Sequence, residues 1–408
     1  MFLNMTMQRN PALIRVARQL HNAGVIEPDT YVIDLDTVVE NAQHIAQTAA
    51  DYGITPWFVE KQYGRNPLVS KAISTQIPKA AAIDVREALG FIRNGIALGN
   101  VGHLVQIPKR FLPRILAARP DFVTVYDQPN LIAVAEAAAQ LGIVQKLLLR
   151  IAGDPAVTYP GQTGGFEPTA IPAVLKSATA YPNIKISGVT GFPCFIYDKA
   201  QGRPIPTATA YRVCQAADSL RSHGIEPTIS LPSHSSCSTI PLVAQLGGTH
   251  VEPGHALTGS TPEHAIRADL LERPAMVYVS EVLQQQPVPQ IAGGGFYARG
   301  HADAALLGSD ERTSRLVSVV SDPAENIDYY RRLVPASDIS EPLLGETAIL
   351  AFRTQVFVTR SQVAVVGGIV KGSPDLLGIF TAQGDALTDI GSNANVFSAE
   401  VVAGGGSG

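Results

Sequence analysis

The chain contains 408 residues, of which 46% are hydrophobic and 16% are charged, and its formal net charge is -4. This length exceeds one ordinary hydrophobic core, so we expect two domains, one of which could be a barrel of roughly 250 residues. The small negative charge and the lack of a dense Lys/Arg run argue against nucleic-acid binding, and no stretch reaches the roughly 18 apolar residues of a membrane span. Residues 1–9 lack the charged segment followed by an apolar segment that is typical of a signal peptide. The three cysteines show neither even pairing nor metal-ligand spacing, which favours free thiols, so we expect a cytoplasmic protein.

Short apolar runs alternate with helical patterns through the first two thirds of the chain. A helical pattern at residues 11–23, a strand at 31–36 and a helix at 38–52 come first. Eight apolar runs follow, at residues 57–61, 80–84, 101–106, 122–126, 146–152, 185–190, 228–231 and 249–252, and helical patterns between them lie at 86–94, 111–118, 131–141, 171–180, 208–223 and 239–246. This alternation predicts an α/β fold with a parallel (β/α)8 TIM barrel. An open doubly wound sheet is the alternative, but the Gly-rich dinucleotide fingerprint is missing after the first strand.

From about residue 267 the pattern changes to strands punctuated by Gly and Pro, with little helix between them. Strand-like segments lie at residues 274–282, 349–358 and 362–369. The sequence therefore predicts a second, β-rich domain.

The first apolar run after the 38–52 helix ends in a lysine. Because successive strand residues alternate between faces, Trp57, Val59 and Lys61 share one face, and Phe58 and Glu60 share the other. Burial disfavours an ammonium ion and makes the neutral amine available as a nucleophile toward a carbonyl group. Lys61 is therefore a candidate to form a Schiff base with a carbonyl cofactor or substrate.

The strand Val-Ile-Asp-Leu-Asp at residues 32–36, a helix with an early Asn41, and a strand that ends in Lys61 and is followed by Tyr63-Gly64 resemble the alanine racemase-like enzymes of fold type III. Within them the chain is similar to the YhfX-type branch. The resemblance implies pyridoxal 5'-phosphate (PLP) bound in a TIM barrel, a Schiff base at Lys61 and a cofactor contact from Tyr63. The implied division is residues 1–36 as a helix and strand that join the second domain, 37–266 as the barrel, 267–403 as the β-rich domain and 404–408 as a flexible tail.

The eighth apolar run ends in Glu-Pro-Gly-His at residues 252–255. This resembles the Glu-Pro-Gly-Arg segment of ornithine and diaminopimelate decarboxylases, which implies that Glu252 pairs with the pyridine nitrogen of PLP and that the Gly254 amide faces its phosphate. A carboxylate there keeps the nitrogen protonated and makes the ring a stronger electron sink. His255 stands in place of the arginine and is expected to contact the phosphate or to line the turn.

A barrel enzyme builds its site at the carboxyl ends of its strands, so two further segments are candidates. The seventh run leads into a Ser/Thr-rich turn whose amides and hydroxyls suit a phosphate, with Ser235 and Ser236 as the chosen contacts. Arg150 ends the fifth run, and a buried arginine needs an anionic partner, which favours a place in the site. The sixth run carries no histidine to stack on the ring, and Cys194 there is expected to be a buried thiol.

In the second domain, the stretch at residues 291–301 combines a glycine triplet with Tyr297 and His301, which we propose as the second acid/base on the opposite face of the substrate. Arg353 is expected to pair with a substrate carboxylate or with a local acid. Asp328 falls near the place of the decarboxylases' Cys-Asp motif and is a weaker substrate-binding candidate.

These residues together predict a PLP-dependent enzyme that acts at Cα of an amino acid or similar amine, with racemisation or epimerisation as the reaction. PLP-dependent decarboxylation and D-amino-acid aldol or lyase cleavage are alternatives, and so is a PLP-binding protein without turnover. A metal-dependent barrel hydrolase that uses His103, His234, His250 and His255 is a further alternative, although no histidine pair at ligand spacing supports a metal site. The resemblance also implies a homodimer with shared active sites.

Overall fold

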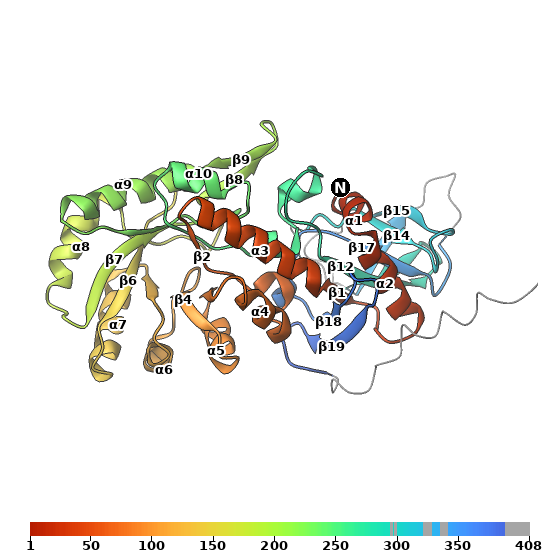
Figure 1. Cartoon of the computed structure of the whole chain (residues 1–408), viewed down its shortest axis with the longest axis horizontal. Coiled ribbons are helices and arrows are strands. Elements are labelled where there is room, and N and C mark those ends of the chain that lie inside the picture. Colours follow the sequence, from red (N-terminus) through yellow and green to blue (C-terminus); the bar gives the residue numbers. More distant parts are fainter. Residues whose placement is uncertain (294–296, 298–299, 321–328, 335–341, 388–408) are drawn as a thin grey trace, which may run out of the picture. The chain divides into compact units, whose positions relative to one another are not determined.

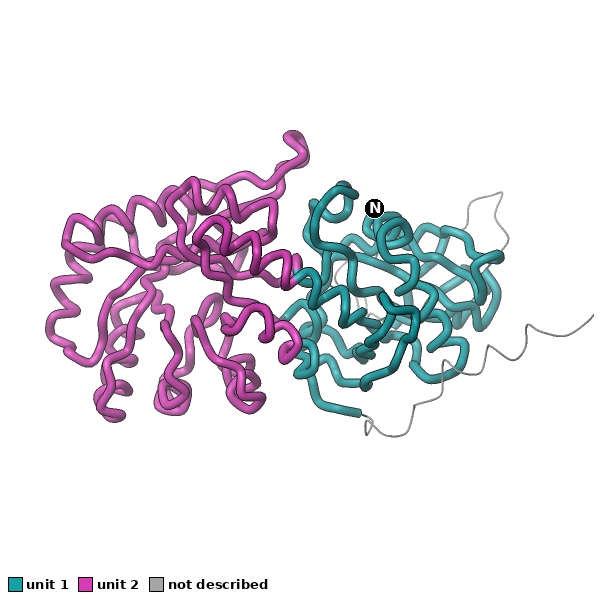
Figure 2. The backbone as a smooth tube through the Cα atoms, viewed as in Figure 1, with its two compact units in different colours: residues 1–41, 61–69, 257–408 teal, residues 42–60, 70–256 magenta. Residues whose placement is uncertain are grey.

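The computed structural model describes residues 1–293, 297, 300–320, 329–334 and 342–387 (Figure 1). The chain forms two compact units (Figure 2). Unit 1 comprises residues 1–41, 61–69 and 257–408, and unit 2 comprises residues 42–60 and 70–256. Residues 61–69 thus group with unit 1, whereas the sequence analysis had placed them within the barrel domain.

Unit 2 is built on an eight-stranded parallel sheet that closes into a barrel. Its order is β2-β11-β10-β7-β6-β5-β4-β3. Closure comes from Phe58, whose amide donates to Lys79 O at 3.1 Å and whose carbonyl accepts from the Ala81 amide at 2.9 Å. The strands are β2 (Thr55–Pro56), β3 (Lys79–Ala82), β4 (Ala97–Val101), β5 (Phe122–Val125), β6 (Gln145–Arg150), β7 (Ile184–Thr190), β10 (Thr228–Ser230) and β11 (His250–Val251). The predicted TIM-type barrel is confirmed.

Helices follow most of these strands and lie on the outside of the barrel (Figure 1). Side-chain caps begin several of them: Asp84 accepts from the amides of Arg86 and Glu87, and Asp127 accepts from that of Asn130. The helices are α3 (Leu35–Asp51), α4 (Pro67–Ser74), α5 (Val85–Arg93), α6 (Leu112–Ala117), α7 (Gln128–Gln140), α8 (Ile171–Ala178), α9 (Ala208–Ser222) and α10 (Ile240–Gln245). Short 3-10 turns are η1 (Lys61–Tyr63), η2 (Lys109–Phe111), η3 (Pro168–Ala170), η4 (His255–Thr258), η5 (Pro262–Ala265) and η6 (Val356–Val358).

The predicted alternation around Trp57 holds up to Glu60. Trp57 and Val59 lie in the apolar cluster inside the barrel with Phe122 and Leu148. Phe58 points outward, where its ring meets Phe91 of α5 edge-on at 5.5 Å. Lys61 is not a strand residue, because the chain turns there into η1 instead of extending the strand.

A hairpin that the sequence analysis did not predict leaves the barrel after β7. It consists of β8 (Phe195–Asp198) and β9 (Arg203–Pro206), and it stands away from the helices near α10 (Figure 1). Its first residue, Phe195, is fully buried, and Phe195 O accepts from the hydroxyl of Ser233 in the β10-α10 turn at 2.8 Å. The hairpin is therefore anchored to that turn.

Unit 1 contains a nine-stranded sheet of order β13-β16-β15-β14-β17-β12-β1-β18-β19. An added pairing of β12 with β13 closes its first six strands into a ring, and β1 lies between β12 and β18. The predicted β-rich second domain is confirmed. The strands are β1 (Thr30–Asp34), β12 (Met276–Gln284), β13 (Gln290–Ala292), β14 (Ala304–Leu307), β15 (Arg315–Val319), β16 (Tyr330–Val334), β17 (Thr347–Leu350), β18 (Gln362–Gly367) and β19 (Asp375–Thr381).

Two N-terminal helices, α1 (Phe2–Arg9) and α2 (Pro11–Asn22), cover part of this sheet. Asn10 caps α2 by accepting from the Leu13 amide at 3.2 Å, with Pro11 at the first helical position. The apolar face of α2, which includes Leu13 and Leu20, packs with β12 residues such as Val277 in one core cluster. The helical pattern at residues 11–23 predicted α2, whereas no pattern in the sequence indicated α1.

Candidate active site

Polar side chains form a layer inside the barrel at the carboxyl ends of its strands. Thr190 is in register with both Arg150 and Ser230, and Ser230 is in register with His250, so these four side chains point to the same side of the sheet. That side is the interior, because the His250 ring packs against Trp57 with centroids 4.2 Å apart, and Trp57 belongs to the apolar cluster inside the barrel. The barrel therefore changes from apolar to polar toward the end where barrel enzymes place their sites.

Glu252 follows β11 and is held at this end by three contacts. Its Oε1 accepts from Asn100 Nδ2 at 3.2 Å, and its amide donates to Ser235 Oγ at 3.2 Å. Its Oε2 lies 2.8 Å from Nδ1 of His103, although without the angle of a hydrogen bond. Both side chains of this pair are almost fully buried, with 1% and 4% exposed for Glu252 and His103. The carboxylate thus has a fixed place.

Arg150 is a buried cation that contacts neutral oxygen atoms. Its Nη1 donates to His103 O at 3.1 Å and to Tyr126 Oη at 3.3 Å, and its Nη2 donates weakly to Gln162 O and Phe192 O, both at 3.4 Å. Among the residues that the structure describes, no carboxylate forms an ion pair with Arg150. A buried cation without an anionic partner is costly, so this place suits a negatively charged or electron-rich oxygen.

Tyr126 supports Arg150 as a neutral phenol. Burial is the main cause that raises the pKa of Tyr126 to about 12, and the Arg150 charge opposes this rise. The phenol donates to His103 O at 2.8 Å while the guanidinium lies over its ring at 5.0 Å. Tyr126 therefore keeps its proton near neutral pH and helps to orient Arg150.

The segment after β7 contributes apolar side chains and a thiol. The Phe192 ring meets the His103 ring edge-on at 5.7 Å and lies 6.0 Å from the Arg150 guanidinium. Cys194 donates to Gly191 O at 3.4 Å, and burial raises the pKa of its thiol. Cys194 is thus a protonated, buried thiol, as the sequence suggested.

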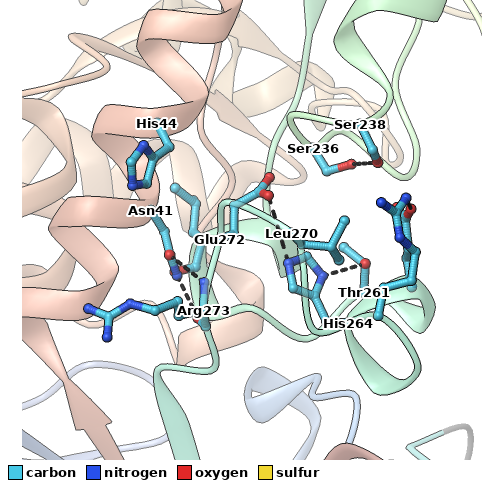
Figure 3. Close-up of polar contacts among 12 residues, drawn as sticks. Asn41, His44, Ser236, Ser238, Thr261, His264, Leu270, Glu272 and Arg273 are labelled. Carbon is cyan, nitrogen blue, oxygen red and sulfur yellow. Dashed lines mark hydrogen bonds and ion pairs between the residues drawn. The ribbon is translucent and has the colours of Figure 1, made fainter. Parts of the chain in front are cut away.

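The Ser-rich turn between β10 and α10 is compact and internally bonded. Ser233 and His234 have positive φ angles of 88° and 51°, which turn the chain sharply. The Ser236 hydroxyl lies 3.0 Å from that of Ser238, a pair shown in Figure 3, and 3.1 Å from that of Thr239. Because Ser235 bonds to the Glu252 amide, the turn is joined directly to the end of β11. The candidates Ser235, Ser236 and Glu252 are therefore neighbours.

Hydrogen bonds connect the segments that carry several candidates of unit 1. Gln62 O, next to Lys61, accepts from Thr354 Oγ1 at 3.0 Å. The Arg353 amide donates to Gly300 O at 2.9 Å, and the Gly300 amide donates to Tyr297 O at 2.8 Å. The structure thus links the turn that begins at Lys61 to the segments that carry Arg353 and Tyr297.

The remaining candidates differ in how far their side chains are buried. Tyr63 is fully buried in the η1 turn, and His301 is exposed with a φ of 58°. His255 begins η4 and is partly buried, next to the buried Gly254. Asp328 lies outside the described residues.

A second polar cluster lies in unit 1 (Figure 3). His264 Nδ1 is 2.6 Å from Thr261 Oγ1, and His264 Nε2 is 3.9 Å from Glu272 Oε2. Asn41 Nδ2 donates to Arg273 O at 2.8 Å, and Asn41 Oδ1 accepts from the Arg273 amide at 2.8 Å. The side-chain amide thus pairs with the backbone of Arg273 in the way that the backbone of a neighbouring strand does. The early asparagine that marked the family resemblance therefore fixes the segment that leads into β12.

Several residues of the barrel site were not candidates in the sequence analysis. Tyr126 and Thr190 are the last residues of their apolar runs, so the strand-end rule could have selected them. Asn100 was missed because the predicted run began one residue later, at 101. His103 was weighed only as a metal ligand, and nothing local in the sequence indicates its contact with Glu252.

In the described part of the chain, no group of three or more His, Cys, Asp or Glu side chains could hold a metal ion. Over the same residues, no helix has the length and apolar character needed to cross a membrane.

Sequence comparisons show the family to which this chain belongs. The family model of the alanine racemase N-terminal domain matches residues 33–262, and that of the YhfX-like C-terminal domain matches residues 277–376. The chain therefore belongs to the alanine racemase N-terminal domain family and carries a YhfX-like C-terminal domain. It is 37% identical to the uncharacterized protein YhfX of Escherichia coli (strain K12) over 393 residues, which cover 95% of this chain and 100% of that protein.

Solved structures share the fold at low sequence identity. Alanine racemase of Clostridium difficile 630 matches with a TM-score of 0.63 and 16% identity over 87% of this chain and 98% of that one. D-threonine aldolase from Filomicrobium marinum matches with a TM-score of 0.65 and 17% identity, over 89% of this chain and 96% of that one. D-threo-3-hydroxyaspartate dehydratase from Delftia sp. HT23 matches with a TM-score of 0.63 and 17% identity, over 87% of this chain and 97% of that one. One architecture thus serves a racemase, an aldolase and a dehydratase, and it does not select among these reactions.

Proposed function

We propose that this protein is a PLP-dependent enzyme that acts at Cα of an amino acid, and that its reaction is racemisation or epimerisation. The observation that carries the proposal is Glu252, a carboxylate buried at the carboxyl end of a barrel strand and held there by Asn100 and the Ser235 hydroxyl. A fixed carboxylate in this place suits a protonated ring nitrogen.

Unsatisfied polar atoms inside the barrel support the fit to such a cofactor. Within the described residues, five buried atoms at the carboxyl ends of the barrel strands have no hydrogen-bond partner. They belong to Glu252 (Oε2), His103 (Nδ1), Arg150 (Nε), Thr190 (Oγ1) and Ser230 (Oγ). A carboxylate matches a ring nitrogen, and a cation with two hydroxyls matches the oxygen substituents of a ring, so these groups fit a polar aromatic cofactor.

Each group would hold one part of the cofactor. Glu252 would face the ring nitrogen, and Arg150 the phenolic oxygen. Ser235, Ser236 and Gly254, with His255 beside them, would face the phosphate at the turn, where backbone amides and hydroxyls are concentrated. When bound, PLP supplies the electron sink that stabilises negative charge at Cα.

Lys61 and a second group, on the opposite face of the substrate, would move the Cα proton. The amine of Lys61 would hold the cofactor, and the same amine would take the Cα proton of the substrate or return it. Racemisation needs a second acid/base, for which we propose Tyr297 or His301, with Arg353 and Asp328 as contacts for the substrate carboxylate. Tyr63 is proposed to support the cofactor from the turn next to Lys61.

We further propose a homodimer with shared sites, in which the β-rich unit of one copy completes the barrel site of the other. The family resemblance supports this assembly. Within one chain, hydrogen bonds link the Lys61 turn to the segments that carry Arg353 and Tyr297. This link favours a Tyr297 from the same chain, so the chain that supplies Tyr297 to each site must be tested directly.

The reaction can be tested by product analysis. The purified protein is titrated with PLP and then incubated with single amino acids in deuterium oxide. Deuterium at Cα together with the opposite enantiomer supports racemisation. Release of an amine and carbon dioxide would show a decarboxylase instead, and an aldehyde with glycine would show an aldolase. PLP binding without exchange in any amino acid would show a binding protein without turnover.

A further inference from the structure

His103 is the residue that contacts both charged groups of the barrel site. Its Nδ1 lies 2.8 Å from Oε2 of Glu252. Its backbone carbonyl accepts from Nη1 of Arg150 at 3.1 Å and from the hydroxyl of Tyr126 at 2.8 Å. Phe192 packs edge-on against its ring. The side chain of His103 is 4% exposed, so this position is fixed from several sides.

The two charges that His103 contacts are buried in one barrel and yet do not pair. Opposite charges in a poorly solvated interior attract strongly and tend to form an ion pair. In the described structure Arg150 instead donates to carbonyl and phenol oxygens, and Glu252 is bound by Asn100. The carboxylate thereby keeps one oxygen, Oε2, that makes no hydrogen bond within the described residues and lies 2.8 Å from Nδ1 of His103.

We propose that His103 is the positioning residue of Glu252. Asn100 fixes Oε1, and His103 fixes the direction of Oε2, so that the carboxylate faces the ring nitrogen of the cofactor instead of turning toward Arg150. This inference rests on the proposed function.

The contact through Nδ1 makes a specific set of variants informative. An asparagine amide nitrogen occupies nearly the place of a histidine Nδ1, whereas a leucine fills similar space without a polar atom. His103→Asn should therefore keep the positioning, and His103→Leu should remove it. Neither change alters the backbone carbonyl that holds Arg150, so the contribution of the side chain is isolated.

The experiment measures how much more tightly the protein binds a cofactor that has a ring nitrogen than one that lacks it. It does not depend on enzyme activity. The dissociation constants of PLP and of its 1-deaza analogue, in which C–H replaces the ring nitrogen, are measured for the wild type, His103→Asn, His103→Leu and Glu252→Gln. Melting temperatures identify variants that remain folded. The wild type should prefer PLP by about ten- to a hundredfold, the range for a hydrogen bond to a charged group. His103→Asn should stay within about threefold of that ratio, and His103→Leu should lower it to that of Glu252→Gln.

The double variant tests whether the two residues act as one. If His103 works through Glu252, then His103→Leu should not change the selectivity further in a Glu252→Gln background. A folded His103→Leu variant with wild-type selectivity would overturn the inference while leaving the proposed function intact. A wild-type protein that binds neither compound, or binds both equally, would overturn the proposed role of Glu252 itself.

Discussion

Replacing His250 by asparagine should remove a large part of the pH dependence of barrel stability. The His250 ring lies inside the barrel against Trp57, and its Nδ1 is 2.8 Å from Thr249 Oγ1. Burial lowers the pKa of His250 to about 4, although the nearby Glu252 charge acts to raise it. Asparagine does not titrate in this range and keeps a polar atom near the hydroxyl, so the variant tests the charge and not the contact.

The magnitude follows from the two pKa values. An unfolded chain protonates His250 near pH 6.5, whereas the folded chain resists protonation until about pH 4. Between these values the unfolded state binds more protons, so the free energy of unfolding falls as the pH falls. The stability due to neutral His250 is fully present above pH 6.5 and is lost toward pH 4. At about 1.4 kcal/mol per pH unit, the loss is about 3 kcal/mol.

Trp57 provides the assay because it is the single tryptophan of the chain and touches His250. Urea unfolding followed by its fluorescence at pH 7 and pH 4 reports on the barrel. The wild type should lose about 3 kcal/mol more than His250→Asn between the two pH values. The matched control is His44→Asn on the exposed face of α3, which should behave as the wild type. Equal pH dependence in the wild type and His250→Asn would refute the reasoning.

Two further predictions concern the chemistry and the assembly. Glu252→Gln should retain PLP yet slow deuterium exchange at Cα by roughly ten- to a thousandfold, because loss of a placed charge costs about 1.4 to 4 kcal/mol in the transition state; an unchanged exchange rate would remove Glu252 from the mechanism. Mixing inactive Lys61→Ala with inactive Tyr297→Phe, after dissociation and reassociation, should restore up to about a quarter of wild-type activity, because half of the dimers are mixed and each has one intact site of two. No recovery from two folded variants, or a monomer in sedimentation, would contradict the shared site.

The barrel was predictable because its signals are local. Strands of period two and helices of period 3.6 alternate along the chain, and that alternation allows few folds. The inward direction of Trp57 and the buried place of Arg150 followed from the same rules. The β-rich unit was predicted only in outline, since its ring of strands depends on pairings between distant segments, such as β12 with β17.

The arrangement of the site depended on contacts that a sequence does not express. Asn100 and Glu252 are 152 residues apart, and only barrel closure brings them to 3.2 Å. The end of the strand before Lys61 was misjudged because a 3-10 turn begins at this residue, in a segment that groups with unit 1. The β8-β9 hairpin was missed because its eight strand residues include two prolines and lack a clear alternation.

The central claim is that Lys61 is the amine that carries PLP. The protein is loaded with PLP, reduced with borohydride, digested and analysed by mass spectrometry. We expect the phosphopyridoxyl group on the peptide that contains Lys61, and we expect Lys61→Ala to lose both this adduct and the visible absorbance band of the bound cofactor. An adduct on another lysine, such as Lys71 or Lys79, or an undiminished band in Lys61→Ala, would contradict the claim.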